Sequence, residues 1–152
     1  MRSSIIMVFA GILALAVFGS EARSEVAWKT ITVIQDAPNG KVSVTDLGVK
    51  GDSPGDITTW NEQLLDTAKK KIGTSSGFCI RTVPGQVSEC QYTLTMQDGS
   101  ITVAGREAEK EASRVSVIGG TGAYAGVSGE DAVTHNADGT FTDVLTLRKT
   151  KP

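Results

Sequence analysis

The sequence predicts an all-β protein whose main domain is an eight-stranded antiparallel β-barrel with a small internal cavity. Beyond residue 23 the chain consists of short runs rich in β-branched residues, and turn residues separate these runs at short intervals. No convincing helical periodicity extends over about 11 residues or more. Strands joined by short turns pair in antiparallel order, and eight of them close a barrel that holds a filled core or one small ligand.

Turn chemistry ends each predicted strand. Pro84-Gly85, Asp98-Gly99 and residues 136–139 are turn signals, and the second of them predicts a hairpin over residues 96–103. Residues 36–56 are interpreted as a turn followed by a Gly-containing loop. A helix over residues 59–72 remains the alternative to the second strand. The predicted strands are residues 28–34, 57–65, 72–83, 89–96, 101–108, 114–118, 127–135 and 141–148.

Residues 1–22 have the pattern of a cleavable secretory signal, which leaves residues 23–152 as one barrel domain. Arg2 precedes an uncharged apolar run of 14 residues, and small residues at Ser20 and Ala22 precede the expected cleavage after Ala22. A membrane anchor is the alternative, but a spanning helix needs about 20 apolar residues. We therefore expect a secreted or periplasmic protein with no membrane association after cleavage.

Composition argues against nucleic-acid binding and against a metal site. The net charge is −2, aromatic residues make up 5% of the chain, and the one basic run is Lys69-Lys70-Lys71. The single His, His135, lies in a turn-like segment and is expected at the surface. One His and two Cys are too few for a structural zinc site, which needs three or four such ligands.

The Gly-rich segment 119–126 is the sharpest local signal in the chain. It follows a strand, as the phosphate-binding turn of a dinucleotide fold does, but no helix and no further βα units come after it. We interpret it instead as a tight connection in which glycines allow positive φ angles and close backbone packing.

Cys79 and Cys90 lie at equal distances from Pro84-Gly85, so the predicted hairpin places them opposite each other. An even pair of cysteines in an exported protein is expected to form a disulfide. A disulfide would remove the free thiol of Cys79 from any chemistry in the barrel.

Two strands carry candidate catalytic residues. Alternation places Trp60, Glu62 and Leu64 on one face, and burial between apolar neighbours would raise the pKa of Glu62 and suit it to proton transfer. The alternative is that this face points outward or that Glu62 lies at the barrel mouth. On a later strand, Tyr92 shares the expected inner face with Cys90, Leu94 and Met96.

Ligand contacts are expected from residues on the same two faces. Trp60 would present an aromatic surface beside Glu62. Arg81 shares a face with Cys79 and could pair with Glu62 or hold a ligand carboxylate, whereas a surface position at a strand end is the alternative.

A series of spaced residues resembles the allene oxide cyclase and dirigent superfamily over residues 55–148. The resemblance implies an eight-stranded barrel with a ligand cavity that forms homodimers or homotrimers and works without a metal or organic cofactor. Plant allene oxide cyclases close a fatty-acid epoxide, and dirigent proteins steer the coupling of phenoxy radicals or quinone methides. The residues that carry the resemblance are Gly55-Asp56, Trp60, Leu64, Gly73, Gly77-Phe78-Cys79, Asp98-Gly99, Ile101, Gly105, residues 119–126 and Gly129.

The cyclase active site transfers only in part. A Glu and an Asn on the family's first strand correspond here to Val33 and Gln35, so the acidic residue is absent. The family's Asn on the second strand falls at Asn61 or Glu62, and its cavity cysteine corresponds to Cys79. The resemblance thus implies ligand contacts at Asn61 and Cys79.

Two functions remain open at this stage. The first is a cofactor-independent barrel that binds a small apolar or aromatic molecule and cyclises, isomerises or orients it, with Glu62 or Tyr92 assisting proton transfer. The second is a non-catalytic exported binding or structural barrel with a filled core. A continuous cavity of about 300 Å³ or more, lined by either residue, would favour the first.

Overall fold

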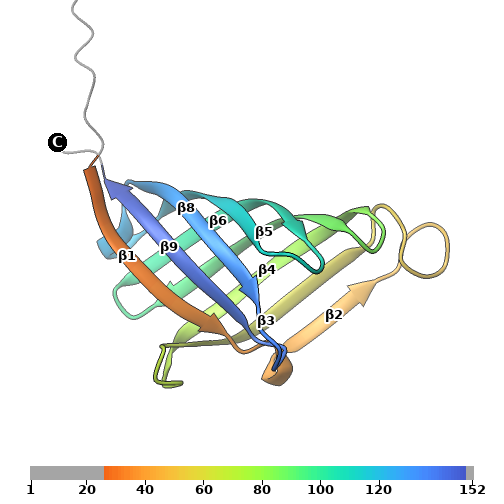
Figure 1. Ribbon diagram of the computed structural model, residues 1–152, viewed down its shortest axis with the longest axis horizontal. Coiled ribbons are helices and arrows are strands. Elements are labelled where there is room, and N and C mark those ends of the chain that lie inside the picture. The colour runs from red at the N-terminus through yellow and green to blue at the C-terminus, as the bar shows by residue number, and fades with distance from the viewer. Residues whose placement is uncertain (1–25, 150–152) are drawn as a thin grey trace, which may run out of the picture.

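The computed structural model describes residues 26–149, which form one antiparallel sheet closed into a barrel (Figure 1). The predicted fold class is confirmed: eight strands form the barrel, and a ninth extends from it. Residues 1–25 and 150–152, which include the expected signal segment, lie outside the described residues. Among residues 26–149 the only helices are two 3-10 turns, so none is long and apolar enough to cross a membrane.

The eight predicted segments correspond to eight of the nine strands. Their neighbours run in the order β1-β9-β8-β7-β6-β5-β4-β3-β2, with an additional pairing between β1 and β3. The elements are β1 (Val26–Gln35), η1 (Ala37–Asn39), β2 (Lys41–Thr45), β3 (Ile57–Leu65), β4 (Lys71–Val83), β5 (Val87–Met96), β6 (Gly99–Ala108), β7 (Ser113–Gly120), η2 (Gly122–Tyr124), β8 (Val127–His135) and β9 (Phe141–Lys149).

One expectation about local structure is wrong, and one alternative does not occur. β2 is a strand where the sequence predicts turn and loop, and its five residues are all exposed because it pairs with β3 alone among the described strands. The helix over residues 59–72 does not form. That segment contains most of β3, a turn and the first residues of β4, and pairing with β4 places successive side chains of β3 on opposite faces.

β1 and β2 share one edge of β3, and this arrangement closes the barrel. β1 pairs with the end of β3 through Ile34 and Gln35 only. The chain then turns through η1, which contains Pro38, and β2 takes over the same edge from Lys41 onward. Figure 1 shows β2 running away from the barrel body. The end of the barrel near η1 is therefore left open.

The opposite end of the barrel is filled. Alternating residues of the strands point inward and form an apolar core in which Leu64, Leu94 and Leu145 are completely buried. Tyr124 of η2 packs against this core and is 2% exposed. The Gly-rich segment is the tight connection that the sequence predicts: Gly122 has φ +58°, and a Cβ there would lie 2.4 Å from the carbonyl oxygen of Asp98.

The expected disulfide is confirmed. Cys79 of β4 and Cys90 of β5 are directly paired in the sheet, with their Cα atoms 4.0 Å apart, and the two sulfurs are bonded. The bond links two neighbouring strands of the barrel wall near the open end.

Candidate functional site

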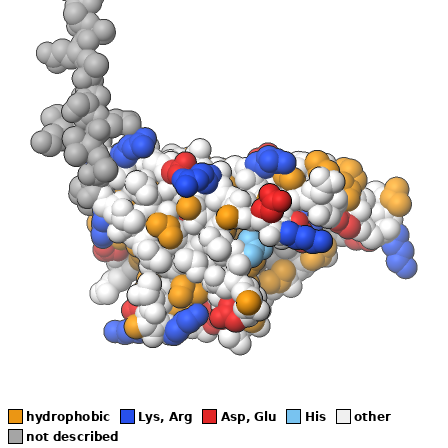
Figure 2. All heavy atoms as spheres, in the orientation of Figure 1, with side chains coloured by type: hydrophobic (Ala, Val, Ile, Leu, Met, Phe, Trp, Pro, Cys, Tyr) orange, Lys and Arg blue, Asp and Glu red, His pale blue; other side chains and the backbone are white. Residues whose placement is uncertain are grey.

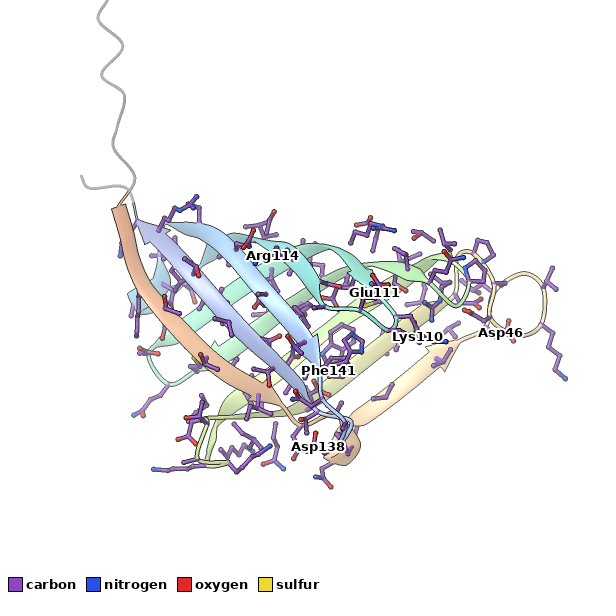
Figure 3. The ribbon with its side chains drawn as sticks, in the orientation of Figure 1. Asp46, Lys110, Glu111, Arg114, Asp138 and Phe141 are labelled. Carbon is purple, nitrogen blue, oxygen red and sulfur yellow. A yellow bond between two sulfur atoms is a disulfide. The ribbon has the colours of Figure 1, made fainter. Side chains whose placement is uncertain are left out.

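A cavity of about 490 Å³ occupies the open end of the barrel. We call it the end cavity. In Figure 3, Asp46, Lys110 and Asp138 mark three connections around this region, with Phe141 between them. Its volume lies in the range of small-molecule sites. It is lined by Gln35, Ala37, Pro38, Val42, Thr58, Trp60, Glu62, Cys79, Arg81, Ser88, Cys90, Tyr92, Glu107, Ala108, Glu109, Val133, His135, Gly139 and Phe141.

Two aromatic rings form one wall of the end cavity because a glycine lies between them. Trp60 of β3 pairs with Gly77 of β4, which in turn pairs with Tyr92 of β5. A Cβ on Gly77 would lie only 2.3 Å from the Cβ of Tyr92. Without that atom, the two rings approach each other over β4, with their centroids 5.7 Å apart.

Glu62 lies inside the barrel, as alternation along β3 predicts. It lines the end cavity and is 6% exposed. Burial and the nearby carboxylate of Asp36 raise its pKa to about 7. The η1–β2 corner covers it, since a Cβ on Gly40 would lie 2.7 Å from the Cβ of Glu62. Glu62 therefore faces inward, and the alternative of an outward-pointing face does not occur.

Three further carboxyls lie near Glu62, and the sequence analysis missed them. Glu107 of β6 lines the end cavity, and burial raises its pKa. Asp131 of β8 and Asp143 of β9 do not line the end cavity and are completely buried in the barrel interior. Burial and then their mutual repulsion raise the pKa of Asp143 far above its ordinary value, and burial also raises that of Asp131. We call these four residues the carboxyl cluster.

Tyr92 connects the end cavity to the buried part of the carboxyl cluster. Its hydroxyl donates a hydrogen bond of 3.3 Å to Oδ2 of Asp131, and the residue is 2% exposed. Burial and then the nearby Asp143 and Glu107 raise its pKa well above 10. The phenol is therefore protonated at neutral pH and can donate a hydrogen bond.

Two predicted site residues have positions that differ from the simplest expectation. Arg81 lines the end cavity but does not pair with Glu62; it forms ion pairs with Asp52 at 2.8 Å and Glu109 at 2.6 Å, both contributed by loops. Asn61 lies on the outer face of β3 and is exposed, so it does not line the cavity.

His135 is exposed, as predicted, but it lies at the rim of the end cavity. Its ring packs edge-on against that of Phe141, with centroids 4.6 Å apart. Figure 2 shows this His, the only one in the sequence, beside apolar side chains on the face it draws.

The positions of the family's first-strand residues have structural roles here. Val33 is completely buried in the core. Gln35 is also buried, and its Oε1 accepts a hydrogen bond of 2.5 Å from the hydroxyl of Ser75, which itself accepts one from the indole of Trp60. Cys79 lies in the wall of the end cavity, where its sulfur is bonded to Cys90. Within residues 26–149, no group of three or more His, Cys, Asp or Glu is arranged to hold a metal ion.

The missed carboxyls did have a sequence signal. Asp131 alternates with Val133, and Asp143 alternates with Leu145 and Leu147, so each occupies a position on the apolar face of its strand. A charged residue at such a position indicates either a strand end or a functional group in the interior.

Comparison with known proteins identifies relatives of the same architecture. Residues 36–144 match the model of a family described as the allene oxide cyclase barrel like domain. No curated protein matches the sequence.

Among solved structures, a pyocyanin demethylase has 26% sequence identity and a TM-score of 0.68, and the match covers 78% of this chain and 99% of that one. A Diels-Alderase from Streptomyces koyangensis has 15% identity and a TM-score of 0.62, covering 82% of this chain and 64% of that one. A pterocarpan synthase dirigent protein has 14% identity and a TM-score of 0.63, covering 84% and 99%.

The contact across Gly77 leads to a prediction about stability. We expect Gly77→Ala to lower the free energy of unfolding by about 1–3 kcal/mol, because the new methyl group would displace Tyr92 from its position beside Trp60. Urea unfolding followed by fluorescence measures the change. Gly119→Ala is the matched control, since nothing lies within 4 Å of a Cβ there, and its effect should stay within about 0.5 kcal/mol. Equal effects of the two substitutions would contradict the packing argument.

The carboxyl cluster leads to a prediction about pH. The folded chain retains protons on Glu62, Asp131 and Asp143 that the unfolded chain releases near pH 4. The unfolded state thus binds fewer protons between pH about 4 and about 7, so stability falls as the pH rises through that range. Asp143→Asn should flatten this slope and raise the unfolding temperature at pH 8. Glu111→Gln, an exposed control labelled in Figure 3, should keep the wild-type slope. An unchanged slope in Asp143→Asn would contradict the assignment.

Proposed function

The chain belongs to the allene oxide cyclase barrel-like family, and from this premise we propose that it is an exported, cofactor-free barrel that binds a small apolar or aromatic molecule and rearranges it by acid–base catalysis. One observation carries the proposal: a single cavity of about 490 Å³ is lined by a carboxyl, Glu62, and a phenol, Tyr92, beside the ring of Trp60. Burial gives the first group a pKa of about 7 and keeps the second protonated.

These properties suit a proton-transfer step at neutral pH. A base works best when its pKa lies near the working pH, and the pKa of Glu62 meets this condition. In the proposed step, the Glu62 carboxylate removes a proton from a carbon of the bound molecule. The hydroxyl of Tyr92 exchanges its hydrogen bond to Asp131 for one to the oxygen on which negative charge develops. The rings of Trp60 and Phe141 would hold the molecule in one reactive orientation.

The relatives support this reading of the cavity. One is named for demethylating pyocyanin, a small aromatic molecule, and others are named as a Diels-Alderase and a pterocarpan synthase dirigent protein. Cyclisation of an allene oxide is not part of the proposal, because Val33 replaces the family's acidic residue and the thiol of Cys79 is used in a disulfide.

A test reaction with a defined proton transfer examines the proposal. In 5-nitrobenzisoxazole, removal of the ring C–H proton by a base breaks the N–O bond and yields the isomeric 2-cyano-4-nitrophenolate, which is coloured. We expect the protein to accelerate this isomerisation, with a rate that rises as the pH passes about 7 because Glu62 must be ionised to act. Glu62→Gln should lower the rate by about 100-fold.

Glu89→Gln serves as the control, because Glu89 is exposed on the outer face of β5. Its rate should equal that of the wild type. A wild-type rate no higher than that of buffer would favour the non-catalytic barrel, and an unchanged rate in Glu62→Gln would remove Glu62 as the base.

Export is tested separately. We expect the mature protein, recovered from the periplasm or medium of the expressing cell, to begin at Arg23 when its mass is measured intact. Ala22→Arg should block processing, because the peptidase needs a small residue there, and the full-length mass should then remain with the cells. A full-length, unprocessed wild-type chain in the cytosol would contradict export.

A further inference from the structure

The end cavity contains more carboxyl groups than basic side chains. Glu62, Glu107 and Glu109 line it, with Asp131 and Asp143 below Tyr92 and Asp36 behind Glu62. The cationic side chain among the lining residues is Arg81. Arg81 forms ion pairs with Asp52 and Glu109, and it forms none with Glu62 or Glu107. His135, at the rim, is exposed and packs on Phe141.

The environment of Glu62 indicates that the end cavity binds a ligand. Only 6% of the residue is exposed, and it lines the end cavity. Within residues 26–149 its carboxyl forms neither a hydrogen bond nor an ion pair, and the charge that acts on it is the like charge of Asp36. Buried carboxyls are ordinarily hydrogen-bonded or paired, so this one is left without its usual partner.

The same feature recurs on β6, three strands away from β3 in the sheet. Oε1 of Glu107 is buried and has no hydrogen-bond partner within the described part of the chain. Both oxygens of Asp143 and Oδ1 of Asp131 share this property deeper in the barrel. Carboxyl oxygens without a hydrogen bond thus lie in the end cavity, on β3 and β6, and in the interior beside it, on β8 and β9. Within residues 26–149 no basic side chain forms an ion pair with them.

The remaining wall of the end cavity is aromatic. Trp60, Tyr92 and Phe141 present ring surfaces beside the carboxyls. The faces of such rings attract cations through their quadrupoles, most strongly in sites that exclude water. A flat aromatic ligand would pack on the rings whether it is neutral or positively charged. A positively charged one would in addition form an ion pair with the carboxylate of Glu62 or Glu107.

We propose that the end cavity selects a flat aromatic ligand with a fixed positive charge, such as a quaternised nitrogen heteroaromatic, over its neutral counterpart. The proposal rests on the proposed function, because it names the class of molecule that the aromatic-binding barrel takes. The ligand's charge supplies the partner that the buried carboxyls lack. Its binding therefore favours the ionised form of Glu62, and the site releases protons when a cation enters.

Isothermal titration calorimetry with two matched compounds tests this. N-methylacridinium carries a permanent positive charge, whereas acridine has the same three fused rings and is largely neutral at pH 7. We expect the cation to bind at least about tenfold more tightly than acridine. Titrations in two buffers with different ionisation enthalpies count the protons released. With a pKa of about 7, Glu62 should contribute up to about half a proton at pH 7, and acridine should release none.

Variants assign the effect to the carboxyls. Glu62→Gln should abolish most of the proton release and most of the cation preference. Glu107→Gln is the second variant, should Glu62→Gln fail to fold, and it should weaken the cation preference in the same direction. Glu89→Gln on the outer face should behave as wild type in both titrations.

The outcomes separate the two proposals. Acridine binding as tightly as N-methylacridinium, or cation binding without proton release, would overturn the charge selection and leave the aromatic-binding function standing. Failure of both compounds to bind would overturn the aromatic-binding function and the charge selection together. A cation preference that persists undiminished in both Glu62→Gln and Glu107→Gln would show that the carboxyls do not produce it.

Discussion

The closure of the barrel depends on a pairing of only two residues, Ile34 and Gln35 of β1 with the end of β3. Because β1 leaves this edge after Gln35, η1 and β2 continue along it and diverge from the rest of the sheet. The same departure ends the pairing of β1 with β9 at Phe141. One end of the barrel therefore stays open, with Glu62 beneath the corner, while the apolar core and η2 fill the other. The position of the cavity follows from this one change of partner.

Alternation along the strands places the inward residues in two zones. At the closed end they are apolar and completely buried, whereas near the open end the carboxyl cluster interrupts the apolar faces of β3, β6, β8 and β9. Buried, unpaired carboxyls lower stability at neutral pH, and an apolar side chain at Asp143 would serve packing better. Their concentration beside the cavity, and not in the filled end, agrees with a role in binding or proton transfer.

The wall formed by β4 and β5 is held by features that the family's active-site pattern does not require. The Cys79–Cys90 disulfide joins the strands at the cavity, and Gly77 allows Trp60 and Tyr92 to meet over β4. Because Cys79 is bonded to Cys90, it has no free thiol. The first strand has Val33 where the family pattern has an acidic residue, so it lacks that carboxyl. The polar groups that line the end cavity instead include Glu62 of β3, Glu107 of β6 and Tyr92 of β5.

The sequence by itself determined the strand runs, the hairpin turns, the pairing of Cys79 with Cys90 and the inward faces that carry Glu62 and Tyr92. These features are local: within a strand, backbone geometry sends alternate side chains to opposite faces, and a turn sets which residues oppose each other. It did not predict β2, because a strand exposed at every residue has no burial pattern to detect. Only the tertiary structure decided that Glu107, Asp131 and Asp143 lie near Glu62, and that loop residues Asp52 and Glu109 hold Arg81 away from it. The residues of each group are far apart in the chain, and the register across a closed sheet is what brings them together.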